Sequence, residues 1–173
     1  MKPIRALILA PAFVAALAAQ QFQIDLSALA AKASDTVDVS LNGATLRFAA
    51  KFLDGDDPEE AGVKKLVAGL EGIYIKGYKF KGRGAWSDAD LDRIRTQLKP
   101  PDWSRIVGVK STEDGETNEV YLRTGPKGIT GVAIIAAEPS ELTVVNIVGP
   151  VDLDSLATLT GHFGIPKVRI PHK

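Results

Sequence analysis

The chain has 173 residues, of which 21 are basic, 21 are acidic and none is cysteine. The lack of cysteine excludes disulfides, thiol catalysis and thiolate metal sites. The formal net charge of zero argues against nucleic acid as an electrostatic partner, because nucleic-acid-binding domains carry a clear basic excess.

Residues 1–19 predict an export signal. Lys2 and Arg5 give a positive start, and the apolar run that follows is too short to span a bilayer. Ala16-Leu17-Ala18 has a small-x-small cleavage pattern, so we expect cleavage after Ala18 or Ala19 and a periplasmic or secreted product without a membrane span. An uncleaved anchor is the alternative. Removing the segment leaves 19 basic and 21 acidic residues, a net charge of −2.

Residues 20–173 are expected to form one domain, because no linker, repeat or low-complexity segment divides them. Apolar residues at helical spacing predict a short helix within 21–33. Two runs of period-two alternation within 37–50 are joined by Asn42-Gly43, which is the strongest short-range signal for a β-hairpin.

Five acidic residues between Asp54 and Glu60 suggest a calcium loop, but its spacing fails. Pro58 and Glu59 occupy the positions where an EF-hand needs an oxygen ligand and a glycine. Asp57 instead predicts the N-cap of a helix, with Glu60 completing a capping box. This helix should run to about residue 71.

A basic strand is predicted over 72–84, where lysines and Arg83 alternate with aromatic residues. Such a pattern can bind an anion or polyanion. It is also typical of an edge strand on which lysines block pairing, and the neutral net charge favours this second interpretation. The strand is nevertheless our first candidate interaction surface, extended by two residues of a later strand. The candidate residues are Lys76, Tyr78, Lys79, Lys81, Arg83, Tyr121 and Arg123.

The second half predicts a helix, a four-strand antiparallel meander and a last helix. Ser87 caps the helix 87–98, and Pro100-Pro101 stops it. The last helix should cover 152–163, followed by an extended tail over 165–173. An asparagine, Asn146, interrupts the apolar fourth strand and needs hydrogen-bond partners if it is buried. The four strands are Trp103–Ser111, Asn118–Thr124, Ile129–Ala137 and Leu142–Val148.

These elements predict an α+β fold with a mostly antiparallel sheet. The sheet would combine the N-terminal hairpin, the basic strand and the meander, and three to four helices would pack on one of its faces. Whether all the strands join one sheet or divide into two halves is left open.

No motif points to catalysis or to a cofactor. His162 and His172 have no second ligand at metal spacing, and no serine-nucleophile or phosphate-loop motif occurs. We therefore assign no catalytic, cofactor or metal residue.

The layout resembles an uncharacterised family of exported bacterial proteins, catalogued as domain of unknown function family 4252. The resemblance covers about residues 25–166 and implies an envelope protein, but no activity and no site residues. This chain differs from members with a lipoprotein signal, because it has no lipobox cysteine. The residues that carry the resemblance are Glu71-Gly-Ile-Tyr-Ile-Lys76, Ile106-Val-Gly-Val109, Val120-Tyr-Leu-Arg123, Ile129-Thr-Gly-Val-Ala-Ile-Ile135, Leu142-Thr-Val-Val-Asn-Ile-Val-Gly149 and Asp152-Leu-Asp-Ser-Leu156.

The expected function is a non-catalytic binding or interaction module of the envelope, signalling through a protein partner. A small ligand-binding or hydrolytic domain with a dispersed site is the alternative. It requires a cavity of about 300 Å³ lined by polar groups. A purely structural role would leave no trace in the sequence.

Overall fold

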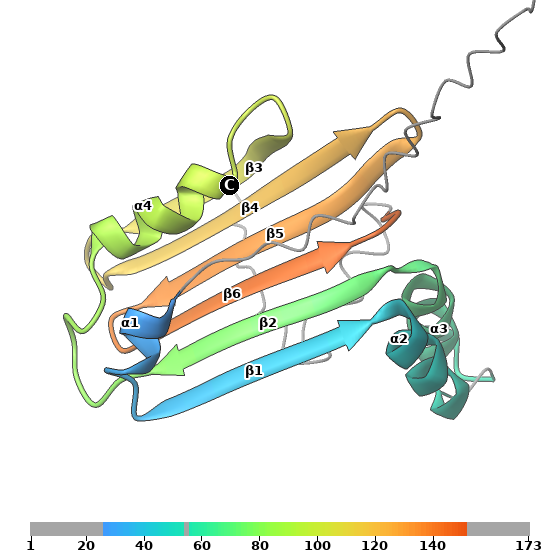
Figure 1. The fold of residues 1–173 in the computed structure, drawn as a ribbon, viewed down its shortest axis with the longest axis horizontal. Helices are drawn as coiled ribbons and strands as arrows, with labels where there is room; N and C mark the ends of the chain where they lie inside the picture. The colour runs from blue at the N-terminus through green and yellow to red at the C-terminus, as the bar shows by residue number, and fades with distance from the viewer. Residues whose placement is uncertain (1–25, 54–55, 152–173) are drawn as a thin grey trace, which may run out of the picture.

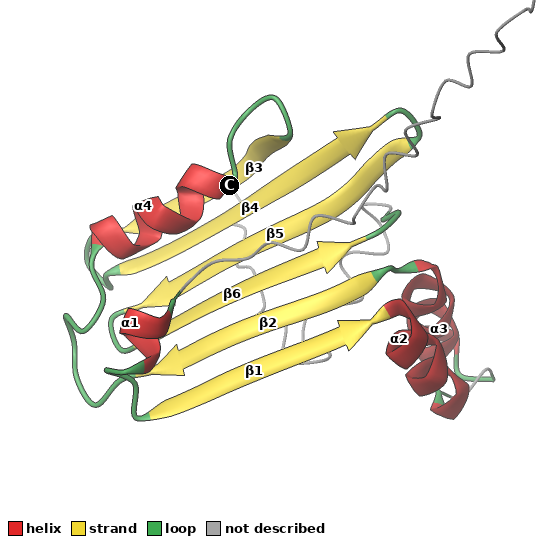
Figure 2. Ribbon diagram, in the orientation of Figure 1, coloured by secondary structure: helices red, strands yellow, loops and turns green. Residues whose placement is uncertain are grey.

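The computed structural model describes residues 26–53 and 56–151, which build one antiparallel sheet flanked by short helices (Figures 1 and 2). The predicted α+β fold with a mostly antiparallel sheet is confirmed. In chain order the elements are α1 (Ser27–Ala30), β1 (Asp35–Asn42), α2 (Gly43–Ala49), the 3-10 helix η1 (Ala50–Phe52), α3 (Pro58–Gly69), β2 (Gly72–Lys79), α4 (Asp88–Gln97), β3 (Trp103–Ser111), β4 (Glu116–Gly125), β5 (Gly128–Glu138) and β6 (Glu141–Val148).

The six strands lie in the order β1-β2-β6-β5-β4-β3, so they form a single sheet. Strands β3 to β6 are neighbours in chain order, which confirms the meander. The basic strand β2 is also confirmed, but it pairs with β1 on one side and with β6 on the other. The edge-strand interpretation of its lysines is therefore wrong, and β1 takes the edge position.

The predicted hairpin at Asn42-Gly43 does not form. Asn42 Oδ1 accepts hydrogen bonds from the backbone N–H of Thr45 at 3.0 Å and from its hydroxyl at 3.2 Å. This is the geometry of a helix N-cap, so the chain leaves β1 directly into α2. Leu46 and Ala50 are buried and stand four residues apart, and this spacing fits a helix as well as a strand.

The cap at Asn42 can be tested by substitution. Replacing Asn42 with alanine should lower the free energy of unfolding by about 1 kcal/mol, because the first turn of α2 loses its side-chain acceptor. Urea denaturation measures the change. Asn42→Asp keeps an acceptor and should stay close to wild type. Equal stability of the alanine variant and wild type would contradict the capping role.

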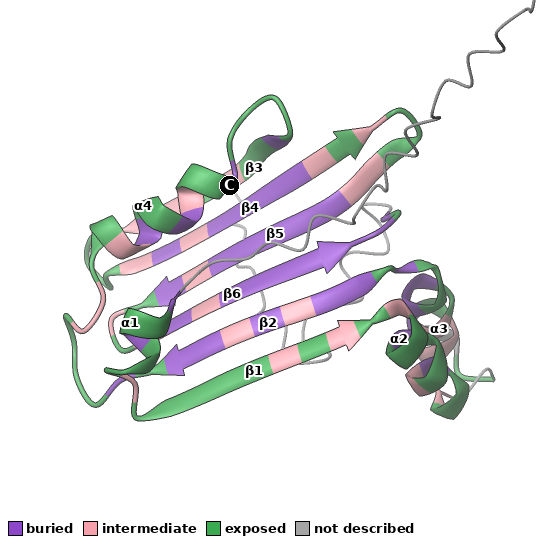
Figure 3. Cartoon of the chain, viewed as in Figure 1, coloured by how far each residue is buried: buried purple, intermediate pink, exposed green. Residues whose placement is uncertain are grey.

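The helices divide between the two faces of the sheet, and this corrects the expectation that they share one face. Helices α2 and α3 pack with one set of alternating strand residues, which we name the α3 face. Helices α1 and α4 pack with the opposite set, the α4 face. Figure 3 shows the resulting burial along the central strands. The α3 face contributes Ile73, Ile75, Val120, Leu122, Val132, Ile134, Val145 and Ile147, and the α4 face contributes Tyr78, Tyr121, Ala133, Ile135, Ala137, Leu142 and Val144.

The starts of α3 and α4 follow the predicted caps. Asp57 accepts a hydrogen bond from the backbone N–H of Glu60 at 3.3 Å at the start of α3. Ser87 and Asp90 form a reciprocal capping box at the start of α4. Of the helix predicted within 21–33, the described part is α1.

The export signal of residues 1–19, the helix over 152–163 and the tail over 165–173 lie outside the described residues. No helix of the described part is long and apolar enough to cross a membrane.

Candidate functional site

The structure does not bring the seven candidate residues together as one exposed surface. Tyr78 and Tyr121 are buried, with exposed fractions of 6% and 5%, because both point to the α4 face, where α1 and α4 pack. Lys79 ends β2, while Lys81 and Arg83 are exposed in the loop after it. Lys76 and Arg123 are half-buried.

Two of the lysines on β2 face carboxylates of neighbouring strands. Lys76 Nζ donates a hydrogen bond to Asp38 Oδ2 on β1 at 2.9 Å, and this bond raises the pKa of Lys76 against the opposing effect of partial burial. Lys79 Nζ lies 4.0 Å from Glu141 Oε2 on β6. The lysines of β2 thus make cross-strand pairs within the chain, instead of forming an open basic stripe.

A buried carboxylate, Glu119 on β4, joins the sheet to α4. The guanidinium of Arg95 donates from Nη2 to Glu119 Oε1 at 2.8 Å and from Nε to both carboxylate oxygens at 3.2 Å. The hydroxyl of Tyr121 donates to Oε2 at 2.7 Å, and Arg105 Nη1 donates to Oε1 at 3.5 Å. The side chain of Glu119 is 4% exposed.

These contacts fix the protonation states of the cluster. Burial alone would raise the pKa of Glu119, but the hydrogen bonds from Arg95 and Tyr121 hold it below its usual range. Burial and the hydrogen bond to Glu119 raise the pKa of Tyr121 to about 12. Glu119 is therefore an ionised acceptor and Tyr121 a protonated donor at neutral pH. The cluster fastens α4 to the sheet and offers no group ready to exchange a proton.

A pocket of about 450 Å³ opens between β1, β2 and β6. Gly77 is among its lining residues and pairs with Val37 on β1 and with Thr143 on β6. A Cβ atom at Gly77 would lie 3.3 Å from Val37 Cβ, a tight contact, and 3.7 Å from Thr143 Oγ1, so the glycine allows β1 to approach β2 closely here. The lining residues are Asp35, Val37, Ile75, Gly77, Tyr78, Lys79, Glu141 and Thr143.

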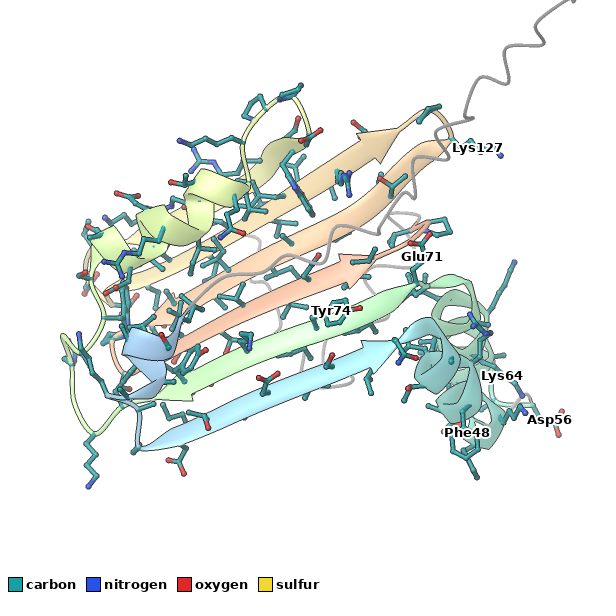
Figure 4. The ribbon with its side chains drawn as sticks, viewed as in Figure 1. Phe48, Asp56, Lys64, Glu71, Tyr74 and Lys127 are labelled. Carbon is teal, nitrogen blue, oxygen red and sulfur yellow. The ribbon has the colours of Figure 1, made fainter. Side chains whose placement is uncertain are left out.

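The pocket has an apolar floor and a polar rim. Val37 is 51% exposed although it is a large apolar residue. Two carboxylates, of Asp35 and Glu141, and one ammonium, of Lys79, stand among the lining residues. The outer edge of β1 pairs with no strand of the described part, so the pocket lies at a border of the sheet. Figure 4 shows the side chains of the sheet viewed from the side on which α4 lies, with Tyr74 labelled on β2.

The ionisable side chains that line the pocket are those of Asp35, Tyr78, Lys79 and Glu141. No group of three His, Asp or Glu side chains that could hold a metal ion occurs within 26–53 and 56–151. Sequence reasoning missed the pocket because Val37, Gly77 and Thr143 meet only through strand pairing. The one local signal was Gly77 itself, since a glycine inside a strand often marks a close approach of another group.

Comparisons with known proteins give a family and one structural neighbour. No curated protein matches the chain. A crystal structure described as crystal form III of TP0453 aligns at 17% identity with a TM-score of 0.22, a value at which the two folds are not shown to be the same. That alignment covers 80% of this chain, which spans about half (53%) of the other. The family model described as "Domain of unknown function (DUF4252)" matches residues 30–159, and the chain therefore belongs to this family.

Proposed function

We propose that the protein is a non-catalytic binding module of the bacterial cell envelope, and that the pocket over Gly77 receives an apolar group of its ligand. The export-signal pattern of residues 1–19 supports the envelope location. The pocket volume of about 450 Å³ supports the binding role, because ligand pockets usually measure about 300–1,000 Å³.

The observation that carries the proposal is the glycine in the middle of β2. Glycine weakens a strand, by about 0.5–1 kcal/mol relative to alanine, because it loses more backbone entropy on folding and packs no side chain. The two residues that pair with Gly77 across the sheet are Val37 and Thr143. Both are β-branched, and such residues are favoured in strands because they pack against side chains of neighbouring strands. Gly77, Val37 and Thr143 all line the pocket, so a side chain at position 77 would extend toward it, and we infer that a ligand group takes this space instead.

The rim indicates the charge of the ligand. Asp35 and Glu141 outnumber Lys79, which lies 4.0 Å from Glu141. The pocket should therefore favour an apolar chain attached to a neutral or cationic head over one attached to an anionic head. A small amphiphile and an apolar side chain of a partner protein share this chemistry. Mass spectrometry of an organic extract of the purified protein detects a bound small amphiphile. Cross-linking in the cell envelope detects a partner protein instead.

Three eight-carbon probes test the pocket and its charge preference. Octylammonium, octyl glucoside below its micelle concentration, and octanoate are titrated into the protein by NMR. We expect octylammonium and octyl glucoside to bind more tightly than octanoate. Gly77→Val should weaken all three at least about tenfold, because its side chain would extend toward the pocket and its Cβ would press on Val37, 3.3 Å away.

A matched glycine variant separates filling of the pocket from a general effect on the sheet. Gly108 lies within β3, away from the pocket, and a Cβ there would make ordinary contact with Arg105 at 3.4 Å. Gly108→Val should leave probe affinity unchanged. The proposal fails if Gly77→Val and Gly108→Val bind the probes alike, or if octanoate binds best.

A further inference from the structure

An aromatic pair projects into solvent from α2 and η1. Phe48 is 60% exposed and Phe52 is 75% exposed. Their rings meet edge to face, with centroids 5.2 Å apart and planes at 72°. Figure 4 shows Phe48 on the outer side of α2, at the end of the molecule where α3 also lies. The only other large apolar residues exposed in the described part are Val37 and Ile106.

The segment of α2 and η1 carries three rows of side chains, each spaced by four residues. Leu46 and Ala50 form the buried row, and Phe48 and Phe52 form the aromatic row. Two residues turn a helix by about 200°, so the aromatic row points away from the buried row. A cationic row of Arg47 and Lys51, both exposed, runs between them. The aromatic row is thus not needed to close the core.

We propose that the aromatic row docks on an anionic phospholipid surface. Two phenylalanines and two flanking cations on one short amphipathic segment suit the boundary between lipid headgroups and acyl chains. Charge complementarity supports a lipid partner, because residues 43–53 contain two cations and no acid. When the aromatic row enters the lipid, Arg47 and Lys51 lie at the level of the lipid phosphates and pair with them.

The acidic residues that follow the segment set the balance of the two contributions. Five acidic residues follow it between Asp54 and Glu60. Of these, Asp56 and Asp57 are exposed near the start of α3, where Asp57 accepts a hydrogen bond from the backbone N–H of Glu60. Their charge limits the attraction of the cationic row to anionic lipid. The apolar contact of Phe48 and Phe52 therefore carries most of the binding, and Arg47 and Lys51 add a salt-dependent part.

Vesicle co-sedimentation tests the proposal on protein recovered after export. Phosphatidylcholine vesicles are used with and without phosphatidylglycerol. We expect binding that strengthens with phosphatidylglycerol. Phe48→Gln with Phe52→Gln should weaken it about tenfold or more. Arg47→Gln with Lys51→Gln should weaken it about fivefold or more at low salt, and added salt should then no longer weaken it further.

A matched variant replaces an exposed apolar residue that lies outside both proposed sites. Ile106→Gln on β3 removes apolar surface elsewhere and should bind vesicles as wild type does. Gly77→Val should also bind them normally, so failure of the pocket proposal and failure of this one are distinguishable. Unchanged binding by the double phenylalanine variant overturns the proposal. So does an oligomer, seen by light scattering, that depends on Phe48 and Phe52, since a second copy then covers the row.

Discussion

Replacing Arg95 with methionine should lower the free energy of unfolding by about 2–4 kcal/mol. The change leaves the buried carboxylate of Glu119, whose side chain is 4% exposed, without its main partner. Breaking a buried ion pair from one side usually costs about 3–5 kcal/mol. The hydrogen bonds from Tyr121 and Arg105 remain and reduce this cost. Urea denaturation measures the difference, with the same dependence of the free energy of unfolding on urea concentration applied to both proteins.

Arg93 on the same helix provides the matched control. Its side chain is 67% exposed, and its ion pair with Asp90 has a distance of 3.9 Å. Arg93→Met should change stability by less than about 0.5 kcal/mol, because exposed pairs contribute little. Equal effects of the Arg93 and Arg95 substitutions would contradict the role of Arg95 as the partner of a buried charge.

The pH dependence of stability gives a second test of the cluster. The pKa of Glu119 is lower in the folded protein than its usual value of 4.5, so the unfolded state binds the proton more tightly. The stability from this group is present above about pH 4.5 and is lost as the pH falls through the folded pKa. Glu119→Gln should therefore make the acid limb of the stability curve shallower than in wild type.

Replacing Asn146 with leucine should raise the free energy of unfolding by about 1–3 kcal/mol. Asn146 on β6 is 2% exposed, and neither Oδ1 nor Nδ2 finds a hydrogen-bond partner in the part of the chain that the structure describes. It sits between Tyr74 on β2 and Ala133 on β5. An unsatisfied buried amide costs about 1–3 kcal/mol, and leucine has a similar shape without polar atoms.

Asn118 on β4 is the control for the gain in stability that we expect from Asn146→Leu. It is half-buried and has no buried side-chain atom without a hydrogen-bond partner, so Asn118→Leu should change stability by less than about 0.5 kcal/mol. Thermal and urea unfolding of both variants supply the numbers. A loss of stability in Asn146→Leu would show that the folded protein does satisfy the amide, and the assignment of Asn146 as a costly residue would then be wrong.

The parts of the fold that depend on local sequence were predictable. The meander follows from β-branched runs separated by turn residues, and the caps at Asp57 and Ser87 follow from short-range hydrogen bonds. The hairpin failed because Asn42 suits both a tight turn and an N-cap. Leu46 and Ala50, four residues apart, satisfy a strand and a helix equally, so the local pattern could not decide between them.

The candidate site depends on contacts between distant residues and was not predictable. The placement of β2 between β1 and β6 is set by pairings such as Val37 with Gly77 and Gly77 with Thr143. The burial of Tyr78 depends on which face α1 and α4 cover. Three of the hydrogen bonds that Glu119 accepts come from Arg95, 24 residues earlier, on a helix that was predicted to share one face of the sheet with the other helices.

The pocket over Gly77 is the central claim, and the position of a bound probe tests it most directly. Octyl glucoside is titrated into wild type and Gly77→Val while the NMR signals of Val37, Ile75 and Thr143 are followed. In wild type we expect shifts concentrated on these three lining residues, and in Gly77→Val we expect these shifts to disappear. Shifts located elsewhere on the protein, or the same shifts in both proteins, would contradict the proposed function.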